Sequence, residues 1–169
     1  MKRIMLLFLF LLAMTLPALA ESPSAQSALE AAYPGATILA SAQNGDDAFF
    51  VLDMGDYNPR RLCGLTLIDG AWTLVIDSDT AVLPDYFENE YRQWRIPYTL
   101  TMALTEDELT LHYRKNAETE TFLFRRSEDE WLFVRYECHD LANDMLFTTD
   151  WDGYALTSQK GSCLLCKTG

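Results

Sequence analysis

Apolar and polar residues alternate along most of this chain, which is the pattern of strands buried on one face. The predicted strands cover residues 36–41, 47–54, 61–68, 71–77, 96–104, 108–115, 119–126, 130–138, 145–151 and 154–160. Short polar turns separate them, and Asn44-Gly45 and Asp69-Gly70 are the clearest hairpin turns. Turns of this length cannot hold crossover helices, so the pattern favours antiparallel meanders over parallel strand–helix–strand units.

Two segments have helical spacing instead. Residues 22–33 carry a narrow stripe of small and apolar side chains, and Pro34-Gly35 stops the helix after them. The stripe consists of Ala25, Ala28, Leu29 and Ala32. Residues 84–94 place three aromatic side chains on one helical face, with acidic residues early and Arg92 late, as the helix dipole favours. These aromatic residues are Phe87, Tyr91 and Trp94.

Together these elements predict an α+β fold made mostly of antiparallel β-sheet, with an N-terminal helix and a second short helix near the middle of the chain. A helix followed by strands occurs twice, over residues 22–78 and 84–158. The repetition is read either as a degenerate internal duplication or as chance similarity between hairpins, and both readings stay open.

Residues 1–20 have the pattern of a secretory signal peptide. Lys2 and Arg3 precede an apolar run over residues 4–16, and Ala18-Leu19-Ala20 supplies the small residues that signal peptidase recognises. We therefore predict cleavage before Glu21, a single globular domain over residues 21–169, and a secreted or extracytoplasmic location without stable membrane insertion. An uncleaved N-terminal anchor is the alternative, because only the length of the apolar run separates the two.

The net charge of the chain limits the classes of partner that we expect. It carries 25 acidic and 13 basic residues, for a net charge of −12. A field of that sign repels phosphate backbones, so no nucleic-acid partner is expected. The expected partner is therefore an unknown protein or small-molecule ligand, and a cationic group would be attracted by the negative potential. Solubility alone also explains an acidic surface.

The four cysteines are candidates for disulfides in an exported chain. They are Cys63, Cys138, Cys163 and Cys166. The last two form a Cys-x-x-Cys pair, but a redox pair of this kind needs a helix that begins at the motif and lowers the thiol pKa. Only three residues follow the motif. Zinc held by Cys138-His139 and the Cys-x-x-Cys pair is a further alternative, without the usual second pair of ligands. We favour structural disulfides or inert thiols, and expect no metal and no cofactor.

The segment ALEAAYPGATILAS, residues 28–41, is similar to the start of exported PepSY-type modules, in which a helix of small residues runs through Pro-Gly into a strand. The similarity covers only the first third of the chain and rests on residues that shape turns. It therefore assigns neither a family nor a ligand.

The remaining candidates concern catalysis and recognition. The sequence contains no G-x-S-x-G motif, and neither His112 nor His139 belongs to a recognisable catalytic pattern. Trp72, Trp131 and Trp151 are the candidate binding residues, since exposed aromatics suit a protein or sugar partner, while core burial is the alternative. We therefore expect an exported, non-catalytic binding domain that acts at or outside the cell surface. An envelope thiol–disulfide or zinc-binding protein using the C-terminal Cys-x-x-Cys is the second hypothesis, and a small secreted hydrolase is the third.

Overall fold

The computed structural model describes residues 23–55, 58–82, 86–88, 93–95, 98–128 and 130–156. These residues form one helix and three antiparallel sheets of four, five and two strands. The described part of the chain is therefore mostly antiparallel β-sheet with a small helical part, as the sequence predicts. The expected signal peptide, residues 1–20, lies outside the described residues.

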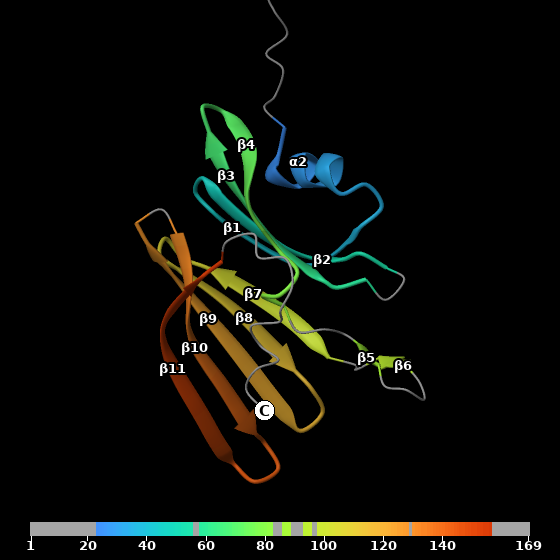
Figure 1. The fold of residues 1–169 in the computed structure, drawn as a ribbon, viewed down its shortest axis with the longest axis vertical. Coiled ribbons are helices and arrows are strands. Elements are labelled where there is room, and N and C mark those ends of the chain that lie inside the picture. Colours follow the sequence, from blue (N-terminus) through green and yellow to red (C-terminus); the bar gives the residue numbers. More distant parts are fainter. Residues whose placement is uncertain are drawn as a thin grey trace, which may run out of the picture.

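Helix α2 (Ala25–Ala32) lies across one face of the four-stranded sheet (Figure 1). The Ser24 side chain accepts a hydrogen bond from the Ser27 N–H at 3.1 Å and caps the first turn. Ala25 and Leu29 are buried, whereas Ala32, expected on the same stripe, is exposed. The buried stripe is thus short, and its small side chains let the helix lie close to the sheet.

The four-stranded sheet is a meander in which each strand pairs with the next. Its strands are β1 (Thr37–Asn44), β2 (Asp47–Asp53), β3 (Arg61–Ile68) and β4 (Ala71–Ser78). The β3–β4 hairpin closes at Asp69-Gly70, as expected from the sequence, and the β1–β2 hairpin closes at Gly45-Asp46, one residue later than expected. Gly45 and Gly70 have φ values of 56° and 79° there, in the left-handed region that two-residue hairpin turns require.

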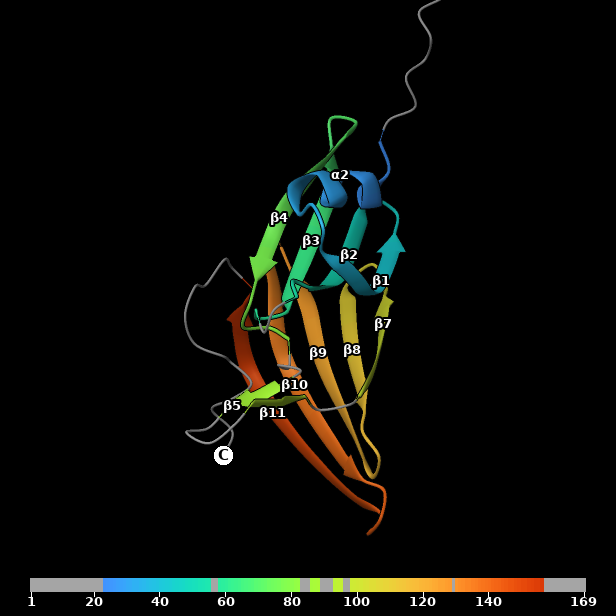
Figure 2. The ribbon, with the colours of Figure 1, turned by 90° about the vertical axis from the view of Figure 1, so that its right-hand side faces the viewer.

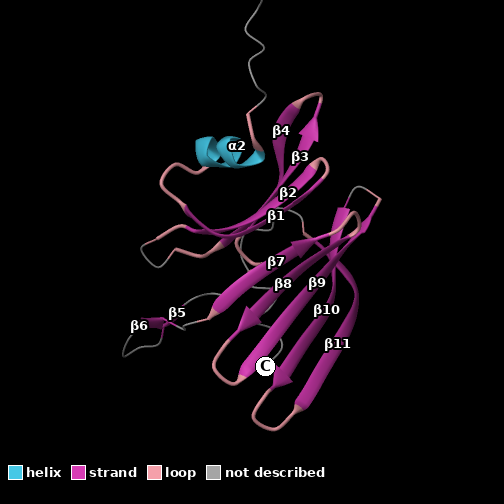
Figure 3. Cartoon of the chain, turned by 180° about the vertical axis from the view of Figure 1, so that it is seen from behind, coloured by secondary structure: helices cyan, strands magenta, loops and turns pink. Residues whose placement is uncertain are grey.

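The five-stranded sheet is a second meander, with β11 at one edge and β7 at the other. Its strands are β7 (Thr99–Leu104), β8 (Glu108–Arg114), β9 (Glu118–Ser127), β10 (Glu130–Asp140) and β11 (Met145–Ala155). The edge strand β7 lies beside β1 of the first sheet (Figure 2). At the edge opposite β7, strands β10 and β11 form a hairpin whose turn projects past the four-stranded sheet (Figures 1 and 3).

One apolar core lies between the two sheets. Phe49 of β2 and Trp131 of β10 meet across it edge to face, with ring centroids 5.1 Å apart. The buried members from the four-stranded sheet and the turn after it are Phe49, Val51, Leu62, Ile76, Ala81 and Val82, and those from the five-stranded sheet and its end are Leu109, Leu111, Tyr113, Phe122, Phe124, Trp131, Phe133 and Leu156. The molecule therefore has three layers: the helix, the four-stranded sheet and the five-stranded sheet.

The predicted helix over residues 84–94 is wrong. The described residues of this segment form a small hairpin of β5 (Tyr86–Glu88) and β6 (Gln93–Arg95), with Phe87 opposite Trp94. Aromatic residues favour strands, and a short aromatic segment satisfies helical and strand spacing equally well. Because this helix is missing, the described residues do not repeat a helix-plus-sheet unit, and the duplication reading loses its basis.

Two irregularities change the expected side-chain faces. The pairing of β10 shifts at Val134 against both neighbours, so Trp131 and Phe133 share the core face with Tyr136, which alternation alone places on the opposite face. The sequence predicts that a turn at Asp152-Gly153 ends the strand before it. In the structure these residues instead lie in a bulge within β11, where Gly153 has a φ of 99°. The separate strand predicted from Tyr154 is instead the end of β11 as far as Ala155.

Candidate functional site

The three candidate tryptophans do not share a surface. Trp131 is 5% exposed and lies in the core between the sheets. Trp151 is half-buried against the same core, with its ring 4.8 Å from that of Phe133. Trp72 is half-buried on the opposite face of the four-stranded sheet, in the cluster beneath α2. The fold thus uses these residues for packing and does not gather them into one aromatic binding surface.

Cys63 and Cys138, the two cysteines among the described residues, are both free thiols. Cys63 is fully buried beneath α2, while Cys138 is half-buried on the five-stranded sheet, so the fold places them in different layers. Cys163 and Cys166, on which the thiol–disulfide and zinc hypotheses depend, lie outside the described residues.

Cys63 is expected to be chemically inert in the native protein. Burial, followed by the charge of Asp77, raises the pKa of its thiol from 9.0 to about 11. The folded state therefore keeps a proton that the unfolded state releases, so this residue makes the free energy of unfolding fall as the pH rises from 9.0 toward about 11. Urea unfolding of the parent and of Cys63→Ala across this range should show a shallower alkaline decline in the variant. Rapid labelling of Cys63 by a thiol reagent under native conditions would contradict this expectation.

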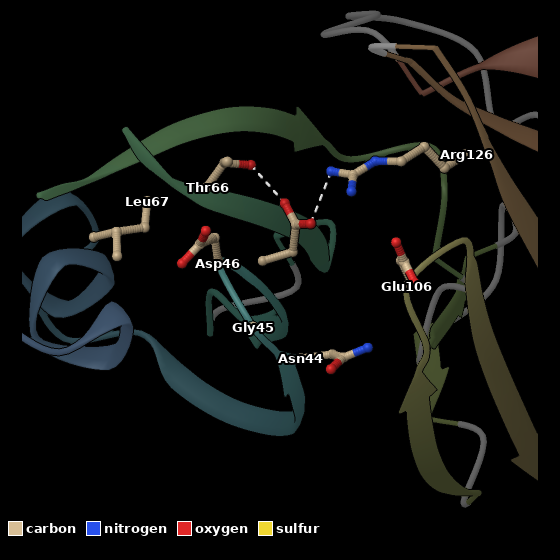
Figure 4. Close-up of a pocket in the computed structure, with 8 residues that line it drawn as sticks. Asn44, Gly45, Asp46, Thr66, Leu67, Glu106 and Arg126 are labelled. Carbon is tan, nitrogen blue, oxygen red and sulfur yellow. Dashed lines mark hydrogen bonds and ion pairs between the residues drawn. The ribbon is translucent and has the colours of Figure 1, made fainter. Parts of the chain in front are cut away.

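Among the described residues, a concave polar feature of about 510 Å³ lies at one end of the interface between the two sheets, which we call the seam. It is lined by residues of the β1–β2 turn, of β3, of the β7–β8 turn and of β9 (Figure 4). The lining residues are Asn44, Gly45, Asp46, Asp47, Thr66, Leu67, Glu106 and Arg126. We refer to this feature as the seam pocket.

Backbone hydrogen bonds hold the turns that form the seam pocket. The Leu67 N–H donates to the Asp46 carbonyl at 2.8 Å, which fixes the β1–β2 turn to β3. The Arg126 N–H donates to the Asp107 carbonyl at 2.8 Å, which fixes the β7–β8 turn to β9. Both turns therefore approach the seam with defined positions, and their side chains face the same space.

The charged pair at the centre of the pocket joins the two sheets. Asp47 accepts a hydrogen bond from the Thr66 hydroxyl at 2.8 Å and forms an ion pair with Arg126 at 2.8 Å (Figure 4). The Asp47 side chain is only 13% exposed. The Arg126 guanidinium also stacks on Trp131, 5.1 Å from the ring centre, so the arginine is held between the core and the pocket.

The remaining polar groups of the pocket face solvent. Asn44, Asp46 and Glu106 are exposed and lie around the Asp47–Arg126 pair (Figure 4). Carboxylate and amide oxygens accept hydrogen bonds from ammonium, guanidinium and hydroxyl groups. Among the described residues there is no group of three or more His, Cys, Asp or Glu side chains that could hold a metal ion.

Sequence reasoning missed this pocket for an identifiable reason. The sequence predicts turns at Asn44-Gly45 and Thr105-Glu106-Asp107, and the structure has turns at Gly45-Asp46 and at residues 105–107. Nothing in the spacing shows that two turns about sixty residues apart meet at the same end of the seam, because that depends on how the sheets pack. The only available signal was the excess of acidic residues in both turns.

Comparison with known proteins finds no matching family model, and no curated protein or solved structure with significant similarity to this chain. The PepSY-type similarity of residues 28–41 therefore stays a local one. No helix in the described part of the chain is long and apolar enough to cross a membrane.

Proposed function

We propose that this chain is an exported, non-catalytic binding domain that recognises a small polar ligand in the seam pocket. The observation that carries the proposal is the pocket itself, because groups from both sheets converge there around a volume of about 510 Å³. A volume of roughly 300–1,000 Å³ is typical of small-molecule sites.

The charges of the pocket favour a ligand with an ammonium or guanidinium group. Asp46 and Glu106 offer exposed carboxylates, whereas the positive charge of Arg126 is already engaged by Asp47. The net charge of −12 also raises the local concentration of cations. Hydroxyl groups beside the cationic centre would suit the Asn44 side chain. The preferred ligand class is therefore a small amine or an arginine-like side chain, and not an anion.

The test is a titration of isotope-labelled protein with arginine methyl ester, with spermidine and with a neutral hexose. We expect the two cationic probes to shift amide resonances around Asp46, Thr66 and Glu106, because their charge meets the free carboxylates. Glu106→Gln should weaken these shifts several-fold, on the order of 1 kcal/mol in binding free energy for one charge-assisted hydrogen bond.

Glu118→Gln is the matched control for this titration. Glu118 is also an exposed acid beside a β-hairpin turn, but it begins β9 at the end of the sheet away from the pocket. Its loss changes the net charge by the same amount and should leave probe binding intact. Equal weakening in both variants, or no response to either cationic probe, would overturn the proposal.

A further inference from the structure

The projecting end of the five-stranded sheet has an exposed apolar surface. Leu141, Met145, Leu146 and Phe147, all in the β10–β11 hairpin, are 43%, 46%, 63% and 56% exposed. Single exposed apolar residues are normal, but here four lie within one hairpin. The pairing with β10 puts Met145 and Phe147 on the same face as the core residue Tyr136, and Leu146 lies on the opposite face. This hairpin extends past the four-stranded sheet, so the second layer that buries the rest of the core face is missing there (Figures 1 and 3).

The same hairpin has an unprotected sheet edge. Strand β11 is the outermost strand of its sheet, and β10 is its only partner among the described strands. Natural edge strands are protected by charges, prolines or bulges. Residues 145–149, Met-Leu-Phe-Thr-Thr, contain no charge and no proline. The protecting features come later, at Asp150, Asp152 and the Gly153 bulge.

The other edges are less accessible. At the far side of the same sheet, β7 lies beside β1. At the free edge of the four-stranded sheet, β4 is interrupted by a register shift at Val75, and a bulge of this kind discourages strand addition. Among the described edges of the four- and five-stranded sheets, residues 145–149 are therefore the segment best suited to pair with another chain.

We propose that residues 145–149 of β11 pair antiparallel with the same residues of a second copy of this chain. The proposal is independent of the seam pocket. A symmetric antiparallel pair places each residue opposite one on the same face of the joined sheet. Phe147 would then lie beside the other copy's Phe147, and the exposed Met145 side chains would be covered on the same face.

The charges around this edge favour a copy of the chain over a basic strand. The acids that flank the segment already have cationic or imidazole partners: Asp150 binds Arg135 at 2.6 Å, and His139 lies 3.1 Å from Asp144. A basic partner would therefore compete with Arg135 for Asp150 and with His139 for Asp144. A second copy instead brings an uncharged strip of the same length, bounded by the same turn and the same bulge.

We expect the dimer to be weak and to become more stable as the salt concentration rises. The paired strip is short, so its area is far below the roughly 1,600 Å² of a standard stable interface. Each copy carries a net charge of −12, so long-range repulsion opposes the pairing. Added salt screens this repulsion, and association should therefore strengthen as the ionic strength rises. A basic partner would show the opposite dependence.

The test is sedimentation equilibrium of the purified protein up to about 1 mM, at low and at physiological salt. We expect the parent to dimerise and Leu146→Lys to weaken the dimer by about tenfold or more, because edge lysines block strand addition. Val75→Lys is the matched control, since Val75 is also an apolar residue on an edge strand and is 50% exposed. Far-UV circular dichroism checks that both variants fold.

Each outcome decides the matter. A dimer that is lost in Leu146→Lys, kept in Val75→Lys and strengthened by salt supports the proposal, as does concentration-dependent protection of the residue 145–149 amides from hydrogen exchange. A parent that stays monomeric throughout overturns it. So does a dimer that Leu146→Lys leaves unchanged, or one that Val75→Lys abolishes, because the interface would then lie elsewhere.

Discussion

Replacing Trp131 with alanine is expected to lower the free energy of unfolding by about 3–5 kcal/mol, the range for deleting a buried aromatic side chain. The residue is 5% exposed and meets Phe49 edge to face across the seam. Its loss opens a cavity between the sheets and also removes the surface on which Arg126 stacks. The effect therefore falls on the packing of one sheet against the other, although the sequence marks Trp131 as a candidate binding residue.

Urea unfolding followed by far-UV circular dichroism measures this change, since the fluorescence of the protein is altered by the substitution itself. Trp72→Ala is the matched control, because Trp72 is half-buried beneath α2 and outside the core between the sheets. We expect a smaller loss there. If Trp131→Ala lowers the free energy of unfolding by less than about 1 kcal/mol, as surface substitutions do, Trp131 is not a core residue. The hypothesis that it is a binding residue would then be the better one.

Gly64→Ala should destabilise the protein by about 1–3 kcal/mol through overpacking. A β-carbon at this position would lie 2.9 Å from Cε1 of Phe49 and 3.1 Å from Cβ of Ile76, closer than side chains normally approach. Alanine in place of glycine would otherwise stabilise a strand by roughly 0.5–1 kcal/mol through the entropy of the unfolded chain. The cost of the steric clash is the larger of the two, so we expect Gly64→Ala to lower the free energy of unfolding.

Thermal and urea unfolding of Gly64→Ala against the parent tests this sign. Phe49→Leu in the same background is the informative second change, because a smaller side chain at position 49 relieves the closest contact. The double variant should then lose less than the sum of the two single variants. A stabilised Gly64→Ala would mean that the Phe49 and Ile76 side chains move aside more easily than their close approach to position 64 implies.

The strands and turns were largely predictable because they rest on local chemistry. The strand over residues 61–68 matches β3 at both ends, and Asp69-Gly70 forms the turn after it, with φ values of 52° and 79°. The first helix was also predictable, since Ser24 caps it and Pro34-Gly35 follows it. Residues 84–94 were not predictable, because Phe87 and Trp94 suit a helical face and a strand pair alike.

What the sequence by itself determined is therefore the antiparallel meander, most of its turns and the N-terminal helix, since side-chain alternation and turn residues act within a few positions of each other. Only the tertiary structure decided which faces became buried. The shift at Val134 turns Tyr136 toward the core, and alternation cannot reveal a bulge that its partner strands impose. The seam pocket likewise depends on two distant turns meeting where the sheets pack, and the open edge at residues 145–149 depends on β11 being the outermost strand. These features are set by packing between segments far apart in the sequence, which local sequence patterns do not predict.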